Sequence, residues 1–85
     1  MKVLIQMSRE HYDLFVAELD IKSREYSILK NNIIAGGPET GRDRRTLEIL
    51  CEKEEADLLL DTATRLYPAA APEIEKAIAR ASTLP

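Results

Sequence analysis

The segment from Gly36 to Arg45 gathers the residue types that could bind an anion. It contains all three glycines of the chain and three of its arginines: Gly36, Gly37, Gly41, Arg42, Arg44 and Arg45. Glycine lets a backbone approach a ligand closely, and arginine supplies a forked, permanently charged donor. The segment matches neither a phosphate-binding loop nor the dinucleotide fingerprint. We therefore expect it to contact a partner protein or a small anionic effector; the alternative is a solvated hairpin loop.

Two further residues could do chemistry, His11 and the single cysteine, Cys51. Cys51 ends an apolar run and precedes a helix, where the helix N-terminus would stabilise a thiolate. It shares a face with Leu47 and Ile49, however, which favours a buried, inert thiol. His11 has no identifiable partner in the sequence, and the pattern favours a surface histidine. An enzyme with an intersubunit site at Cys51 and His11 stays an alternative.

Acidic and basic residues are unevenly distributed along the chain. The net charge is −3, but residues 30–45 hold four basic and two acidic residues, and residues 48–61 hold six acidic and one basic. The acidic total argues against a general nucleic-acid binder, which needs a basic face. Nucleic-acid binding through the basic loop is kept as an alternative. The acidic residues after Cys51 lack calcium-loop spacing and suit the first turn of a helix, so we expect no metal and no cofactor.

The first half of the chain predicts a strand, a helix and a second strand. Val3, Ile5 and Met7 alternate as in a short strand, and Ser8 is a good N-cap. Apolar residues at helical spacing then predict a helix over residues 8–20. Residues 26–34 are mostly apolar and predict a second strand, interrupted by a bulge or a turn at Asn31 and Asn32.

The second half predicts a strand and two helices. Residues 46–51 alternate with period two, and residues 53–67 repeat apolar side chains at helical spacing. Pro68 stops that helix, because proline disfavours helical geometry in the residue before it. Pro72 opens a last helix, with Ile74, Ala77 and Ile78 on its apolar face.

The resulting order, β-α-β-β-α-α, indicates an α+β fold of the ferredoxin-like class. The two strands within residues 26–51 should form an antiparallel hairpin, with the third strand beside the first. The fourth strand of that class is missing or replaced by the C-terminal helix. The first strand would then expose an edge, which the last helix or a neighbouring subunit must cover.

Size and composition indicate one small soluble domain over residues 1–85. A chain this short buries only roughly 60% of its unfolded surface, so we expect a homo-oligomer. One cysteine allows no internal disulfide. The N-terminal apolar run is too short for a signal peptide, and no run approaches the ~20 apolar residues that span a membrane. A cytoplasmic location is the expectation.

Several segments give the chain a layout that resembles the P-II signalling and CutA-like proteins. They are Lys2-Val-Leu-Ile-Gln-Met-Ser, Tyr26-Ser-Ile-Leu-Lys and the run from Leu47 through Cys51-Glu-Lys-Glu-Glu into a helix. Tyr67-Pro-Ala-Ala-Ala-Pro-Glu-Ile is similar to the His-Pro-Tyr-x-x-Pro-Glu-Ile run of CutA-like proteins. It keeps Pro68 and the Pro72-Glu73-Ile74 triplet, and it has Ala69 where the family has an aromatic residue.

The resemblance implies a ferredoxin-like fold, a trimer and a regulatory contact made by the loop between the second and third strands. The basic, glycine-containing segment that holds nucleotide phosphates in P-II proteins has no counterpart here, since residues 69–75 contain neither glycine nor a basic residue. The sequence thus predicts a small, oligomeric, non-enzymatic regulatory or adaptor module that uses the loop 36–45.

Overall fold

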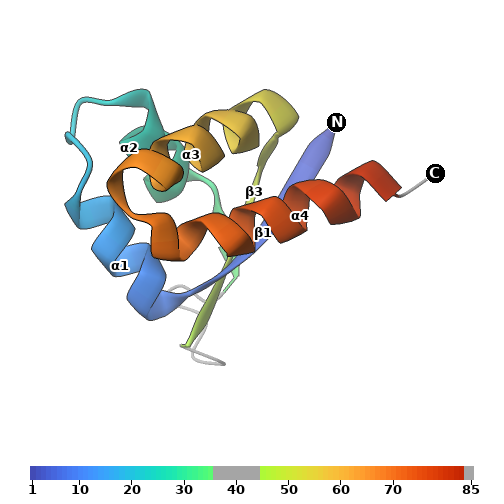
Figure 1. Cartoon of the computed structure of the whole chain (residues 1–85), viewed down its shortest axis with the longest axis horizontal. Helices are drawn as coiled ribbons and strands as arrows, with labels where there is room; N and C mark the ends of the chain where they lie inside the picture. The colour runs from blue at the N-terminus through green and yellow to red at the C-terminus, as the bar shows by residue number, and fades with distance from the viewer. Residues whose placement is uncertain (36–44, 84–85) are drawn as a thin grey trace.

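The computed structural model describes residues 1–35 and 45–83, which form an α+β fold of one antiparallel sheet packed with helices. The elements follow one another as β1 (Lys2–Ser8), α1 (Arg9–Ala17), α2 (Arg24–Asn31), β2 (Ile33–Ala35), β3 (Thr46–Glu52), α3 (Lys53–Leu66), the 3-10 turn η1 (Pro68–Ala70) and α4 (Ala71–Thr83). Figure 1 shows α3 beside α4, and α4 passing in front of β1.

β3 is the central strand of the sheet, and both of its neighbours run antiparallel to it in the order β1-β3-β2. β1 pairs along its whole length, from Lys2 opposite Glu52 to Ser8 opposite Thr46. The third strand therefore lies beside the first, as the sequence predicts. β2 is short, and its register shifts between Ile33 and Ala35. The layout is compatible with a small ferredoxin-like domain.

One face of this sheet forms the floor of the core. Along β1 and β3 every second side chain is at most 1% exposed, which follows from the period-two geometry of a strand. These side chains are Val3, Ile5, Met7, Leu47, Ile49 and Cys51. All four helices send buried side chains into the same cluster, among them Phe15, Leu29, Leu59 and Ile74. The helices thus cover one face of the sheet.

The prediction of a strand from Tyr26 onward is wrong, because residues 24–31 form helix α2. The Ser23 hydroxyl caps this helix by accepting from the Tyr26 N–H at 3.1 Å, and Glu25 lies in its first turn. Ile28 and Leu29 are buried from the helix, so tertiary packing overrides the preference of Ile28 for strands. Only Ile33–Ala35 remains as strand, and the order becomes β-α-α-β-β-α-α, with η1 before the last helix.

The last two helices begin and end close to where the sequence predicts. A capping box starts α3: the Glu52 N–H donates to Glu55 Oε1 at 2.9 Å, and the Glu52 side chain accepts from the backbone in return. Pro68 ends it and begins η1. α4 packs along β1 of its own chain, with Ile74, Ala77 and Ala81 buried. Small alanines allow this close approach, so the C-terminal helix is the cover that β1 needed.

Candidate functional site

The predicted contact loop lies almost entirely outside the described residues. The undescribed part, residues 36–44, contains five of the six predicted contact residues: Gly36, Gly37, Gly41, Arg42 and Arg44. Arg45, the last residue of the loop, is exposed, and its carbonyl accepts from the Arg9 N–H at 2.7 Å. This bond fixes the end of the loop beside the start of α1, at the same end of the sheet as Ser8.

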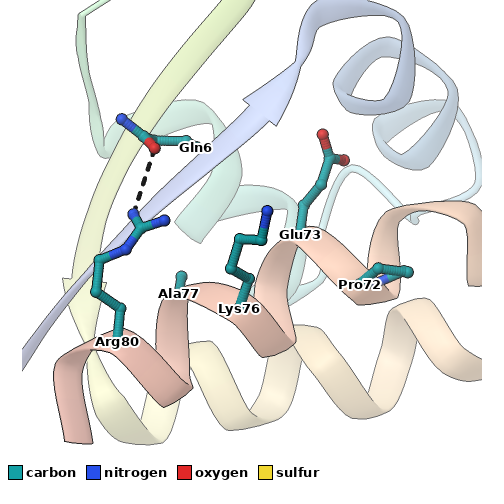
Figure 2. A pocket seen from close by; sticks show the side chains of 6 residues that line it. All are labelled: Gln6, Pro72, Glu73, Lys76, Ala77 and Arg80. Atoms are coloured by element: carbon teal, nitrogen blue, oxygen red, sulfur yellow. Dashed lines mark hydrogen bonds between the residues drawn. The ribbon is translucent and has the colours of Figure 1, made fainter. Parts of the chain in front are cut away.

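A groove runs between β1 and α4, and polar side chains from both elements line it. Its volume is about 240 Å³. The lining residues are Gln6 from β1 and Pro72, Glu73, Lys76, Ala77 and Arg80 from α4. Figure 2 shows the side chains of Glu73, Lys76 and Arg80 rising from α4 toward β1, where Gln6 lies. Helical spacing explains this convergence, since residues three and four apart share one side of a helix.

Glu73 closes one end of the groove and holds three elements together. Its Oε2 accepts from the Ser8 N–H at 2.9 Å, at the end of β1, and its Oε1 lies 2.7 Å from His11 Nδ1 on α1. The His11 ring also meets the Tyr67 ring edge-on, with 6.0 Å between their centres. Both members of the pair are partly exposed, His11 to 34% and Glu73 to 25%. This carboxylate–histidine pair joins α1, β1 and α4.

The expectation that His11 lacks a partner is therefore corrected. Its partner lies 62 residues further along the chain, so local sequence could not reveal it. The carboxylate of Glu73 orients the ring and leaves Nε2 facing away from that bond. Among the described residues no group of three or more His, Cys, Asp or Glu could hold a metal ion.

The basic side chains of the groove come from successive turns of α4. Arg80 Nη1 donates to Gln6 Oε1 at 3.3 Å, and Gln6 Nε2 donates onward to Glu48 Oε2 at 3.0 Å. Lys76 is exposed, and no ion pair joins its ammonium to any other described residue. The groove thus combines a guanidinium, an ammonium and an amide beside a carboxylate that already has partners.

Sequence reasoning missed this groove, although one signal for it was present. Lys76 and Arg80 are four residues apart in a segment that predicts a helix, which places both on one side. Their meeting with Gln6 depends on how α4 lies along β1, and that follows only from the tertiary packing.

Cys51 does not pair with His11. Its side chain is 1% exposed in the core, and burial raises the pKa of its thiol to about 11, with a smaller contribution from the charge of Glu55. Cys51 lies opposite Val3, whereas His11 follows the other end of β1, about 17 Å away at the rise of a strand. The described geometry favours the inert thiol.

The second face of the sheet carries mixed side chains and no helix of the described chain. Leu4 and Leu50 lie opposite each other there and are half-buried, and Ile34 on β2 is 56% exposed. Polar pairs flank them: Lys2 Nζ lies 3.0 Å from Glu52 Oε1, and Gln6 bonds Glu48. Apolar side chains thus lie between polar pairs on a face that no described helix covers.

None of the described helices combines the length and the apolar character that crossing a membrane requires. Comparison of the chain with protein-family models, with curated proteins and with solved structures finds no match. The resemblance to P-II and CutA-like proteins stays a prediction, and the site has to be interpreted from its own geometry.

Proposed function

We propose that this chain is a small non-enzymatic regulatory or adaptor module that associates with copies of itself. The observation that carries the proposal is the face of the sheet that none of the helices in residues 1–35 and 45–83 covers. It presents Leu4 and Leu50 between the polar pairs described above, with the exposed Ile34 on the neighbouring strand β2. An apolar centre within a polar rim is the usual anatomy of a protein interface.

The charges on this face suit contact between identical copies. In a twofold interface one patch meets itself, so a patch of a single sign would repel its copy. Here Lys2 stands beside Glu52, and the neutral Gln6 stands beside Glu48. A small domain also gains the most from burying such a face, because its own core covers a limited share of its surface. If the P-II/CutA-like resemblance holds, the assembly is instead a trimer, in which two different patches meet at each contact.

A single substitution on this face tests self-association. Ile34→Glu places a charge on the exposed β2 part of the proposed interface, and Ile21→Glu is the matched control, since Ile21 is also exposed, at 72%, but lies in the turn before α2. Sedimentation velocity should show an oligomer for the wild type and for Ile21→Glu, and a monomer for Ile34→Glu. A wild-type protein that stays monomeric at all concentrations would refute the proposal.

The partner contact in this proposal belongs to residues 36–45. Replacing Arg42, Arg44 and Arg45 together by alanine should abolish binding to labelled poly-glutamate, a probe for an acidic protein surface, and leave the melting temperature nearly unchanged. The control replaces Lys22, Arg24 and Lys30, which removes the same charge elsewhere. If the loop variant binds as tightly as this control, the loop is not the contact site.

A further inference from the structure

His11 and Glu73 form a pair whose chemistry the proposed self-association does not use. Glu73 Oε1 lies 2.7 Å from His11 Nδ1, and Glu73 Oε2 accepts from the Ser8 N–H at 2.9 Å, so both oxygens of the carboxylate are held in place. The Tyr67 ring meets the imidazole edge-on, at an angle of 66° between the two planes. The imidazole is thus fixed from two sides, by a hydrogen bond and by an aromatic ring.

The hydrogen bond to Glu73 determines which ring nitrogen of His11 can react. A carboxylate only accepts hydrogen bonds, so Nδ1 carries the proton, and Nε2 of the neutral ring keeps its lone pair. Within residues 1–35 and 45–83, no hydrogen bond joins Nε2 to another group. The side chain is 34% exposed, so the ring is accessible to small molecules in solution. His11 therefore presents one oriented, nucleophilic nitrogen.

We propose that His11 is a phosphorylation site, with Nε2 as the acceptor and a phosphoramidate as the class of donor. A histidine nitrogen is a known type of nucleophile for group transfer. Here the Nε2 lone pair forms a bond to phosphorus, the P–N bond of the donor breaks, and the amine leaves with the electron pair of that bond. The donor reacts in its ammonium form, so the amine leaves neutral and the imidazole ring takes up the positive charge. One P–N bond replaces another, and no further reactant is needed.

The surroundings of the pair stabilise both charges of the product. Positive charge develops on the ring as the new bond forms, and the Glu73 carboxylate faces that charge through Nδ1–H, as the carboxylate of a catalytic triad does for its histidine. Both residues also lie in the first turn of a helix, His11 in α1 and Glu73 in α4. The positive end of a helix dipole favours the negative charge that a phosphoryl group brings.

Incubation of the full chain with potassium phosphoramidate tests this inference, because His11 is the single histidine of the chain. Phosphorus and nitrogen NMR of isotope-labelled protein should show one phosphoryl group, bonded to Nε2. The same chain unfolded in urea should react more slowly and at both ring nitrogens, since it lacks the hydrogen bond to Glu73. A folded protein that is not phosphorylated on the ring, or that reacts at both nitrogens as the unfolded chain does, overturns the inference.

A matched pair of variants tests the part of Glu73. Glu73→Gln keeps an oxygen for the Ser8 N–H but removes the carboxylate, so phosphorylation should slow roughly tenfold, the size expected for the loss of one charge-assisted hydrogen bond, and should extend to Nδ1. Glu75→Gln removes the same charge from an exposed position of α4 and should leave the rate within about twofold and the product at Nε2. Equal rates and products in wild type and Glu73→Gln would show that Glu73 does not orient the ring, against the inference. Should Glu73→Gln lose its fold, the comparison of folded and unfolded wild type still decides.

This inference does not depend on self-association. Ile34 lies on β2, whereas His11 and Glu73 lie on α1 and α4, so the Ile34→Glu variant keeps the whole pair. It should be phosphorylated as the wild type is, whether or not the wild type forms oligomers. Phosphorylation without an oligomer, or an oligomer that is not phosphorylated, therefore separates the two proposals.

Discussion

The two faces of the sheet use the same strands in opposite ways. On the inner face Val3, Ile5 and Ile49 are fully buried under the helices. On the outer face the alternate residues of the same strands are at least partly exposed, with Leu4 opposite Leu50 and Gln6 opposite Glu48. Each strand thus contributes every second residue to the core and every second residue to the surface.

This difference predicts that the inner face determines the folding stability of the protein and that the outer face determines its binding. The inner face carries the apolar burial that holds the helices on the sheet, and substitutions there should act on folding. The outer face and the nearby groove carry charges and half-buried apolar side chains, and substitutions there should act on what the protein binds. Three predictions test that division, beginning with the largest expected effect.

Reactivity of thiols should differ most between the two faces. Cys51 is buried, and the pKa of its thiol is raised to about 11, so at pH 8 it is both inaccessible and protonated. We expect its labelling by iodoacetamide to be slower than that of an unfolded chain by a factor of roughly 10³ or more, set by the free energy of opening the core. The rate should rise steeply as urea unfolds the protein.

The matched control moves the thiol to the outer face. Glu48→Cys in a Cys51→Ala background places a cysteine three residues away on the same strand, where the side chain is partly exposed. This variant should react at nearly the rate of the unfolded chain. Comparable, fast labelling of both proteins would mean that the inner face is open to solvent.

Truncating leucines on β3 should show the same contrast in stability. Leu47 on the inner face is 1% exposed, and Leu50 on the outer face is half-buried. Leu47→Ala should lower the free energy of unfolding by about 2–5 kcal/mol, because it leaves a cavity under the helices. Leu50→Ala should lower it by roughly 1 kcal/mol, since its side chain is already in contact with water.

Urea unfolding followed by circular dichroism measures both changes. If Leu47→Ala leaves too little folded protein, Ile49→Val replaces it, with an expected loss of about 0.5–1.5 kcal/mol. A loss for Leu50→Ala as large as that for Leu47→Ala would contradict the division between the faces.

The two faces also explain how far the sequence predicts the fold. β3 was predictable because the alternation of buried and exposed positions appears directly in residue types such as Leu47, Glu48 and Ile49, and β1 because a polar residue, Gln6, lies between the buried Ile5 and Met7. Residues 24–31 were not, because Ile28 and Leu29 are compatible with both strand and helix. The Ser23 cap and burial against the core decide for a helix.

The candidate site was less predictable than the fold, for a physical reason. His11 and Glu73 meet across 62 residues, and Gln6 and Arg80 meet across 74, so their pairing depends on how α4 lies along β1. The sequence indicated one feature correctly, the buried thiol of Cys51. It also singled out the loop 36–45, which lies outside the described residues apart from Arg45, so that part stays a prediction.

The smallest expected effect concerns the ion pair at the edge of the outer face. The hydrogen bond and charge of Lys2 lower the pKa of Glu52 below its ordinary 4.5, and Glu52 in turn raises the pKa of Lys2 above 10.5. Because the folded pKa of Glu52 is depressed, its stabilisation is present above the unfolded pKa and is lost as pH falls through the folded value. For Lys2 the stabilisation is present below pH 10.5 and is lost as the pH rises through its raised pKa.

Lys2→Met should move the titration midpoint of the Glu52 carboxyl group, followed by NMR, upward toward 4.5. An unchanged midpoint would show that solvent screens this exposed pair completely.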